Sequence, residues 1–167
     1  MTRAKPAPAD AKPGKPSDAP LDQSGLLGLV GYNCRRAYIP ILSLFLERMA
    51  PLKLRPVDYS VLVLLRANGG VTQKRLSQAL NVSPPNLAVL LDKLQDRGLL
   101  ERVRNPDDKR SQILHLTALG RETVDTAGSQ VERLERDATA APPGAKRAQM
   151  ISLLQRVFMP RAAGSAR

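Results

Sequence analysis

The sequence is poor in the residues that build metal centres, disulfides and thiol-dependent enzymes. It has one cysteine and one histidine among 167 residues, which excludes an internal disulfide and a conventional four-ligand zinc site. Aromatic residues make up 3% of the chain while 43% is hydrophobic, so the core must consist of Leu, Val, Ile and Ala, which favour helices. No apolar run reaches the roughly 20 residues that span a bilayer. We therefore expect a mainly helical, cytoplasmic protein with no membrane segment, metal or cofactor.

Positive charge is in clear excess. The chain carries 26 Lys and Arg against 15 Asp and Glu, a formal net charge of +11. Residues 52–116 hold 11 basic and 6 acidic side chains, so this middle segment contributes a net +5. Nucleic acid is the commonest partner of a small basic domain, although a solvated charged surface gives the same composition. Neither a nucleophile–base pair nor a phosphate-cradling glycine motif is evident, so we do not expect an enzyme.

The two ends of the chain differ in composition from its middle. Residues 1–20 contain five prolines and four basic side chains, which predicts a disordered tail, and residues 161–167 are expected to form a second one. Residues 21–51 repeat apolar side chains at three- and four-residue steps, the pattern of one long amphipathic helix. Residues 117–160 predict two more helices, separated by the Pro-Pro-Gly break that starts at Pro142.

The middle segment, residues 52–116, has the pattern of a winged helix-turn-helix. Proline, threonine and serine stand where helices begin, and glycines stand where two of them end. Two short strand-like stretches then flank a charged loop, which indicates a hairpin. Three helices and two strands are expected, over residues 56–69, 72–80, 83–97, 99–104 and 111–116. The fold class is therefore mainly α, with a two-stranded wing and helical flanks.

In such a lobe the second helix of the pair, here residues 83–97, enters the major groove of DNA. Its leading residues outside the apolar face are Ser83, Pro85, Asn86 and Val89. Asparagine can pair with adenine through two hydrogen bonds, which makes Asn86 the first candidate for base recognition. Alternatively, Ser83 and Asn86 only cap the helix. Phosphate contacts are expected from the basic side chains of the lobe, namely Lys74, Arg75, Lys93, Arg102, Arg104 and Lys109.

Residues 71–120 resemble the DNA-binding core of the MarR family of bacterial transcriptional regulators. The resemblance is sharpest at the wing, where Asp108-Lys109-Arg110 precedes a strand that ends in Leu116-Thr117 and is followed by Gly120. An arginine at a hairpin tip can enter a narrow minor groove, where the negative potential is concentrated. Arg110 is therefore expected to insert, and the resemblance implies that Asp108 holds it in position. An exposed turn with compensating charges is the alternative.

The flanking helices predict a two-fold homodimer. The apolar faces of residues 21–51 and 117–160 exceed what the lobe can cover, and the family resemblance implies that these segments form the dimer. Two recognition helices related by a two-fold axis would read a pseudo-palindromic operator in double-stranded DNA. The expected function is a regulator, by family default a repressor.

The resemblance also implies a ligand site where the dimer helices meet the DNA-binding lobe. Arginines beside aromatic side chains suit a small aromatic or heteroaromatic carboxylate, because the guanidinium binds the acid and the apolar wall holds the ring. The same tyrosine, isoleucine and histidine side chains can instead be ordinary core or strand residues. The candidates are Tyr32, Arg35, Arg36, Tyr38, Ile39, Asp58, Tyr59 and His115.

Two other functions remain open at this point. Some members of the family sense peroxides through a cysteine, and Arg35 and Arg36 beside Cys34 could favour a thiolate. Cys34 also falls on the apolar face of its expected helix, where a buried and inert thiol is more common. A constitutive architectural DNA-binding protein is the second alternative, and it would bind without regard to sequence or metabolites.

Overall fold

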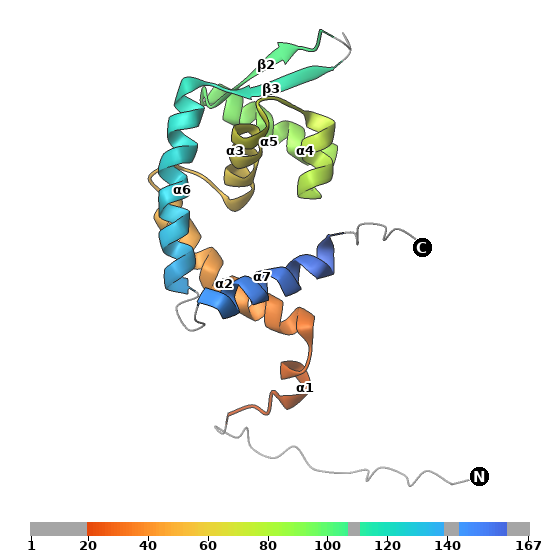
Figure 1. Cartoon of the computed structure of the whole chain (residues 1–167), viewed down its shortest axis with the longest axis vertical. Coiled ribbons are helices and arrows are strands. Elements are labelled where there is room, and N and C mark those ends of the chain that lie inside the picture. Colours follow the sequence, from red (N-terminus) through yellow and green to blue (C-terminus); the bar gives the residue numbers. More distant parts are fainter. Residues whose placement is uncertain (1–19, 107–110, 139–143, 160–167) are drawn as a thin grey trace, which may run out of the picture. The chain divides into compact units, whose positions relative to one another are not determined.

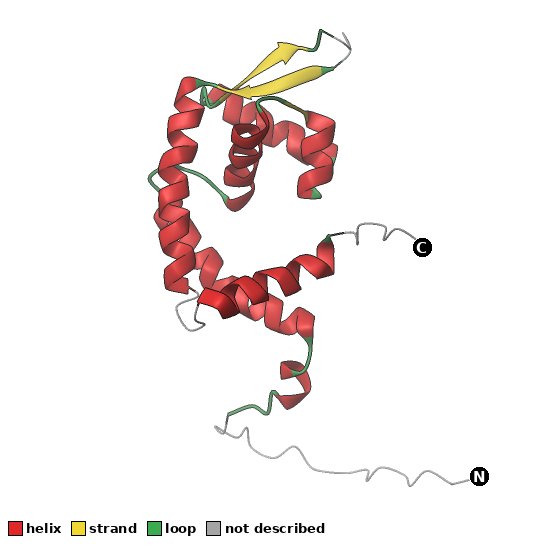
Figure 2. Ribbon diagram, viewed as in Figure 1, coloured by secondary structure: helices red, strands yellow, loops and turns green. Residues whose placement is uncertain are grey.

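The computed structural model describes residues 20–106, 111–138 and 144–159, and it divides the chain into two compact units, residues 1–36 and 37–167. The described part is mostly helical, with one small sheet (Figure 2). Within these ranges no helix is long and apolar enough to cross a membrane. The predicted tails, apart from Pro20, and the expected wing tip with Asp108, Lys109 and Arg110 lie outside the described residues.

The first predicted helix is in fact two helices. A short helix α1 (Ser24–Leu27) ends at Gly28, and α2 (Val30–Met49) begins two residues later, so the expectation of one continuous helix was wrong. The side-chain amide of Asn33 donates hydrogen bonds of 2.8 Å to the backbone oxygens of Leu27 and of Leu29. The bond to Leu27 satisfies a carbonyl at the end of α1, and the Leu29 oxygen also accepts from the backbone N–H of Asn33 at 3.1 Å. Helix periodicity does not report such a break, because the apolar spacing continues across it.

The three helices of the lobe begin and end where the sequence predicts. They are α3 (Pro56–Asn68), α4 (Gln73–Leu80) and α5 (Pro84–Asp96). Gly69 ends α3 in the left-handed conformation, with φ of 63°. Thr72 caps α4 by accepting a 3.4 Å hydrogen bond from the backbone N–H of Arg75.

The wing belongs to a three-stranded sheet rather than to an isolated hairpin. Strands β2 (Leu100–Arg104) and β3 (Gln112–Leu116) pair antiparallel as predicted, and β1 (Val71–Thr72) pairs with the other edge of β3. The strand order is β1-β3-β2. The sequence did not predict β1 because two residues are too short to show an alternating pattern.

One apolar core holds the second unit together. Helix α6 (Ala118–Ala138) packs along α3, and α4 and α5 pack against each other beneath the sheet (Figure 1). The last helix, α7 (Gly144–Phe158), follows residues 139–143, which lie outside the described residues. The core leucines of α5 are each 6% exposed or less, which leaves the opposite face of this helix to solvent. They are Leu87, Leu90, Leu91 and Leu94.

Candidate nucleic-acid interface and ligand pocket

The leading turn of α5 presents the predicted base-reading residues to solvent. Ser83, Pro85, Asn86 and Val89 are all exposed, on the side opposite the core leucines. Ser83 stands at the N-cap of α5, but its side chain makes no capping hydrogen bond. The alternative that Ser83 acts as a side-chain cap is therefore wrong, and its hydroxyl faces outward.

Helix α4 fixes where α5 begins. The side-chain amide of Gln73 donates a 3.2 Å hydrogen bond to the backbone oxygen of Pro84, across the helix-turn-helix. Ser77 donates a 2.7 Å hydrogen bond to the backbone oxygen of Val82, in the turn itself. Asn81 turns the chain in the left-handed conformation, with φ of 50°. These contacts hold the two helices in a fixed arrangement.

Arg102 connects the wing to the recognition helix. From β2 its Nη2 donates to Oδ1 of Asp92 at 2.6 Å, and its Nη1 donates to Oε1 of Gln95 at 2.8 Å. The side chain is only 20% exposed, and its two acceptors belong to α5. Arg102 was predicted as a phosphate contact, but the structure engages its guanidinium inside the lobe. Sequence reasoning missed this pair because its members are ten residues apart on different elements.

The other predicted phosphate contacts differ in how they are placed. Lys74, Arg75, Lys93 and Arg104 are exposed on α4, α5 and β2, as a phosphate contact requires. Lys109 lies outside the described residues together with Asp108 and Arg110. These four accessible cations lie in the first half of α4, in the last turn of α5 and at the end of β2.

The spacing Leu116-Thr117-x-x-Gly120 has a structural role at the base of the wing. The hydroxyl of Thr117 donates to the backbone oxygen of Gly98 at 2.6 Å and accepts from the backbone N–H of Gly120 at 3.0 Å. Thr117 thus caps α6 while connecting it to the end of α5. The wing strand β3 and helix α6 leave this point in fixed directions.

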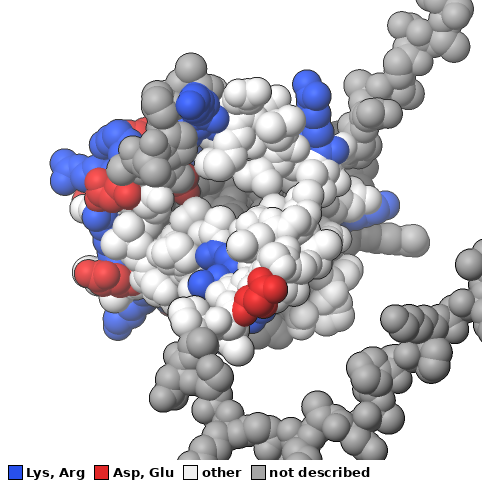
Figure 3. Space-filling view, turned by 90° about the horizontal axis from the view of Figure 1, so that it is seen from below, with Lys and Arg blue, Asp and Glu red and all other residues white. Residues whose placement is uncertain are grey.

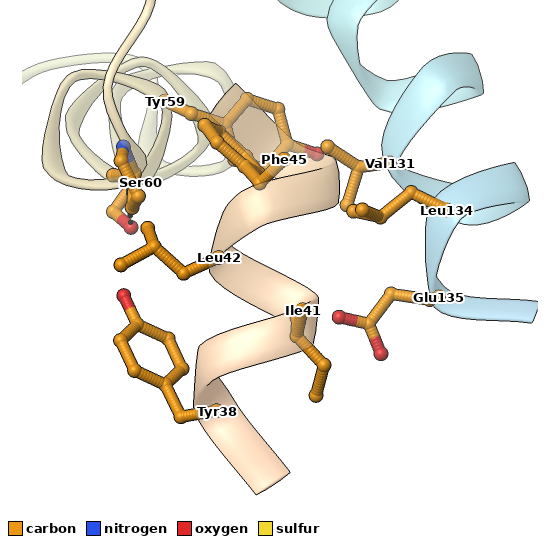
Figure 4. Close-up of a pocket in the computed structure, with 10 residues that line it drawn as sticks. Tyr38, Ile41, Leu42, Phe45, Tyr59, Ser60, Val131, Leu134 and Glu135 are labelled. Carbon is orange, nitrogen blue, oxygen red and sulfur yellow. Dashed lines mark hydrogen bonds between the residues drawn. The ribbon is translucent and has the colours of Figure 1, made fainter. Parts of the chain in front are cut away.

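A cavity of about 210 Å³ lies between α2, α3 and α6 (Figure 4). Its walls are mainly apolar, with two phenols, one hydroxyl and one carboxylate among them. In Figure 4 the carboxylate of Glu135 points from α6 toward Ile41 of α2. The lining residues are Tyr38, Ile41, Leu42, Phe45, Pro56, Tyr59, Ser60, Val131, Leu134 and Glu135.

Tyr59 forms one wall of this cavity beside Phe45. The two ring centroids are 6.1 Å apart and the ring planes are tilted by 59°. Burial raises the pKa of the Tyr59 phenol above its ordinary value, and the nearby Glu132 carboxylate raises it further. Tyr59 is therefore a neutral hydrogen-bonding group at physiological pH.

The structure brings together only two of the eight predicted effector residues. Tyr38 and Tyr59 line the cavity, whereas Ile39 is 44% exposed and lies outside its lining. Tyr32, Arg35 and Arg36 belong to the first unit, and the hydroxyl of Tyr32 donates to Oε1 of Gln23. The contribution of α6 was not predicted, because apolar residues at helical spacing in that segment indicate any packed face equally well.

Two of the remaining effector candidates, His115 and Asp58, have roles in packing and in helix capping instead. His115 packs against the backbone of Gly70, where an added Cβ would lie 2.6 Å from its Cε1 atom. Asp58 is buried and accepts hydrogen bonds from the backbone N–H of Arg55 at 2.8 Å and from the Arg55 guanidinium at 3.1 Å. The Asp58 carboxylate raises the pKa of Arg55 through this bond and through its charge. Asp58 therefore caps α3 and does not line the cavity.

Cys34 is exposed in the first unit. The expectation that Cys34 is buried on the apolar face of its helix was wrong for this single chain, in which the residues around it are also exposed.

Comparison with known proteins identifies the family of this lobe. A MarR family model matches residues 52–111. The chain is 36% identical to the transcriptional repressor CouR, solved bound to a 23-mer DNA duplex, with a TM-score of 0.78 over 83% of this chain and 99% of that one. It is 27% identical to a putative transcriptional regulatory protein for the hcr operon of Thauera aromatica, over 87% of this chain and 90% of the relative. It is also 28% identical to the transcriptional repressor NicR of Pseudomonas putida, over 69% and 74% of the two chains.

Proposed function

The chain belongs to the MarR family of DNA-binding transcriptional regulators, which are not enzymes, and from that premise we propose that it is a homodimeric repressor released from its operator by a small aromatic or heteroaromatic carboxylic acid. The observation that carries the proposal is the mainly apolar cavity between α2, α3 and α6. It adjoins α3, which packs directly on α4 of the helix-turn-helix. A ligand in this cavity therefore touches the support of the DNA-reading helix.

DNA recognition is assigned to α5 and the wing. Asn86 reads a base edge, with Ser83, Pro85 and Val89 beside it in the major groove. Arg110 enters the minor groove and Asp108 holds it, as the family resemblance implies. Cations surround this surface and bind phosphates, while Arg102 holds the wing against α5. The phosphate contacts are Lys74, Arg75, Lys93, Arg104 and Lys109.

The dimer is assigned to the apolar surface of the flanking helices. Six of the 15 residues of α7 are large apolar side chains exposed in the single chain. In Figure 3 most of the charged side chains of this face lie toward the left, and a basic and an acidic group lie close together in the otherwise uncharged middle. A helix with such a surface requires a partner, and a second copy supplies one. The exposed large apolar side chains of α7 are Met150, Ile151, Leu153, Leu154, Val157 and Phe158.

Light scattering after size exclusion tests the dimer. We expect twice the chain mass for the wild type and a loss of dimer for Leu154→Glu, because a charge would be buried at the interface. Val63→Glu, at an exposed valine of α3 in the DNA-binding lobe, is the matched control and should remain dimeric. A monomeric wild-type protein that still binds a palindromic operator would contradict the assignment.

The effector is tested with ligand and DNA together. A thermal-shift screen of benzoate, hydroxycinnamate and nicotinate compounds should find a stabilising acid, and that acid should release the protein from DNA upstream of its own gene. Binding alone does not release DNA, because the ligand must favour a state in which the recognition helices no longer match successive major grooves. A stabilising ligand that leaves DNA affinity unchanged would contradict the proposed regulation.

The exposure of Cys34 supports one second candidate, a thiol-based sensor. If the aromatic-acid proposal holds, Cys34→Ser keeps DNA binding and ligand response, and peroxide releases wild type and variant alike. A large peroxide effect that disappears in Cys34→Ser would favour the redox sensor. An architectural protein is distinguished by equal affinity for the operator and for unrelated DNA.

A further inference from the structure

The cavity between α2, α3 and α6 has no cation of its own among its lining residues. Its polar groups are the phenols of Tyr38 and Tyr59, the hydroxyl of Ser60 and the carboxylate of Glu135. A carboxylic acid bound there as an anion would face Glu135, and two carboxylates in a partly dry site repel each other. An anionic ligand therefore requires a positive charge supplied from outside the lining.

Arg147 of α7 is the cation that the structure places next to this carboxylate. Its Nη2 lies 3.3 Å from Oε2 of Glu135, and the two side chains are 35% and 36% exposed. A guanidinium binds any carboxylate through the same planar pair of N–H donors. The group that holds Glu135 is thus chemically suited to hold the carboxylate of a ligand in its place.

We propose that Arg147 is the anion-binding residue of this cavity, and that the ligand carboxylate displaces Glu135 from its guanidinium. The exchange keeps Arg147 paired, and Glu135 can turn into water because it is already partly exposed. The inference rests on the proposed function, since it names how the effector is held. Arg147, like Arg35 and Arg36, is not a lining residue, but it is paired with Glu135, which is one. It therefore replaces the two arginines of α2 as the expected anchor.

The exchange also makes ligand binding depend on the arrangement of the dimer helices. In the ligand-free chain the Arg147–Glu135 pair joins α7 to α6. A ligand carboxylate is not attached to α6, so its binding removes this connection while retaining a contact with α7. Ligand affinity then depends on how α6 and α7 are arranged, and this dependence couples binding to the spacing of the two DNA-reading lobes.

The test compares each acid with its own methyl ester. Benzoate, 4-hydroxycinnamate and nicotinate, and the three esters, are titrated by calorimetry into the full chain. Arg147→Ala should weaken binding of the acid by about tenfold or more, the loss of a charged hydrogen bond, and change ester binding little. Arg147→Lys should restore part of the acid affinity. Arg156→Ala, an exposed arginine on the same helix, is the matched control and should bind like the wild type.

Glu135→Gln gives a second and opposite readout. It removes the competing charge but keeps the shape of the side chain, so acid binding should strengthen while ester binding stays the same. Thermal melting of each variant shows that it is folded before it is titrated. Loss of acid affinity in Arg147→Ala together with its gain in Glu135→Gln would support the exchange.

Failure of this inference and failure of the proposed function have different signatures. Leu42→Trp fills the cavity and should abolish acid binding. If it does so while Arg147→Ala binds acid and ester like the wild type, the effector site is correct and the Arg147 anchor is wrong. If no acid binds the wild type, or if Leu42→Trp leaves acid binding intact, the proposed effector site is wrong, and so is the assignment of Arg147 as its anchor.

Discussion

The backbone oxygen of Leu99 lies 1.9 Å from the position that a Cβ atom would occupy on Gly120. Leu99 begins the wing and Gly120 lies in the first turn of α6, so the two elements touch backbone to backbone. The same oxygen accepts a 3.3 Å hydrogen bond from the N–H of Thr117. Only glycine permits this approach, which explains the Gly120 of the family motif physically.

Gly120→Ala should therefore destabilise the protein strongly. Neither the Leu99 carbonyl nor α6 can move without breaking the Thr117 bonds, and overpacking of this kind costs about 1–3 kcal/mol or more. Urea unfolding measures the change. Gly128→Ala is the matched control in the same helix, because its Cβ would lie 3.8 Å from the Tyr59 hydroxyl, an ordinary contact. The control should gain about 0.5–1 kcal/mol from helix propensity, and equal losses in both variants would contradict the close-contact argument.

The pairing of Arg102 with Asp92 predicts that both residues position the wing. Arg102→Ala and Asp92→Ala should each weaken operator binding, because either change frees β2 from α5. Electrophoretic titrations over a range of salt concentrations separate this role from a phosphate contact. A positioning residue leaves the salt dependence of binding nearly unchanged, whereas loss of one phosphate contact reduces its slope by about one.

Asp92 makes this test decisive, since a carboxylate cannot bind phosphate favourably. Lys93→Ala, at the neighbouring exposed position, is the control that should flatten the salt dependence. If Asp92→Ala strengthens DNA binding and Arg102→Ala flattens the slope, Arg102 contacts phosphate after all.

Asp58 is expected to matter for stability and not for the ligand. It accepts three hydrogen bonds from Arg55 at the start of α3 and is 5% exposed. Asp58→Ala removes this cap and should lower the free energy of unfolding by about 0.5–2 kcal/mol. Calorimetric titration with the effector should give the same affinity as the wild type at a temperature where both are folded. A selective loss of ligand affinity would return Asp58 to the effector site.

The features that the sequence predicted correctly, such as the ends of helices, are set by residues close together along the chain. Pro56 and Gly69 set the two ends of α3, and Thr72 sets the start of α4, each within a turn of its own position. The pairing of Arg102 with α5 and of Arg147 with α6 involves side chains brought together only by packing. No spacing rule reports such contacts.

The same limit applies to the cavity: some of its residues were predicted from the sequence, and those that come from a distant segment of the chain were not. Its two tyrosines, one on α2 and one on α3, were identified because aromatic residues close to charged residues are visible in the sequence. The wall formed by Val131, Leu134 and Glu135 comes from α6, more than 70 residues after Tyr59 in the chain. Asp58 was assigned to the effector site because it is charged. Its carboxylate instead accepts a hydrogen bond from the backbone N–H of Arg55 at the start of α3.

Tyr59 predicts a fall in stability in alkaline solution. Burial and Glu132 raise the pKa of its phenol in the folded state, so the unfolded chain releases this proton first. The contribution of the neutral phenol is complete below about pH 10, the ordinary pKa of tyrosine, and is lost as the pH rises through the folded pKa. Urea unfolding between neutral and alkaline pH should show this loss, and Tyr59→Phe should reduce it. Tyr38→Phe removes another phenol of the cavity as the control, and an equal effect of both variants would contradict a specific role for Tyr59.

Arg110 is the residue of the wing on which DNA affinity should depend most. It lies outside the described residues, and its proposed role rests on the motif that surrounds it and on the preference of arginine for a narrow minor groove. Arg110→Ala should weaken operator binding by about 1–3 kcal/mol while the dimer stays folded. Arg110→Lys should recover little of that affinity, because lysine is costlier to desolvate in the groove. Gel-shift titrations against operator and unrelated DNA measure both effects, and unchanged operator affinity in Arg110→Ala would remove the wing tip from the mechanism.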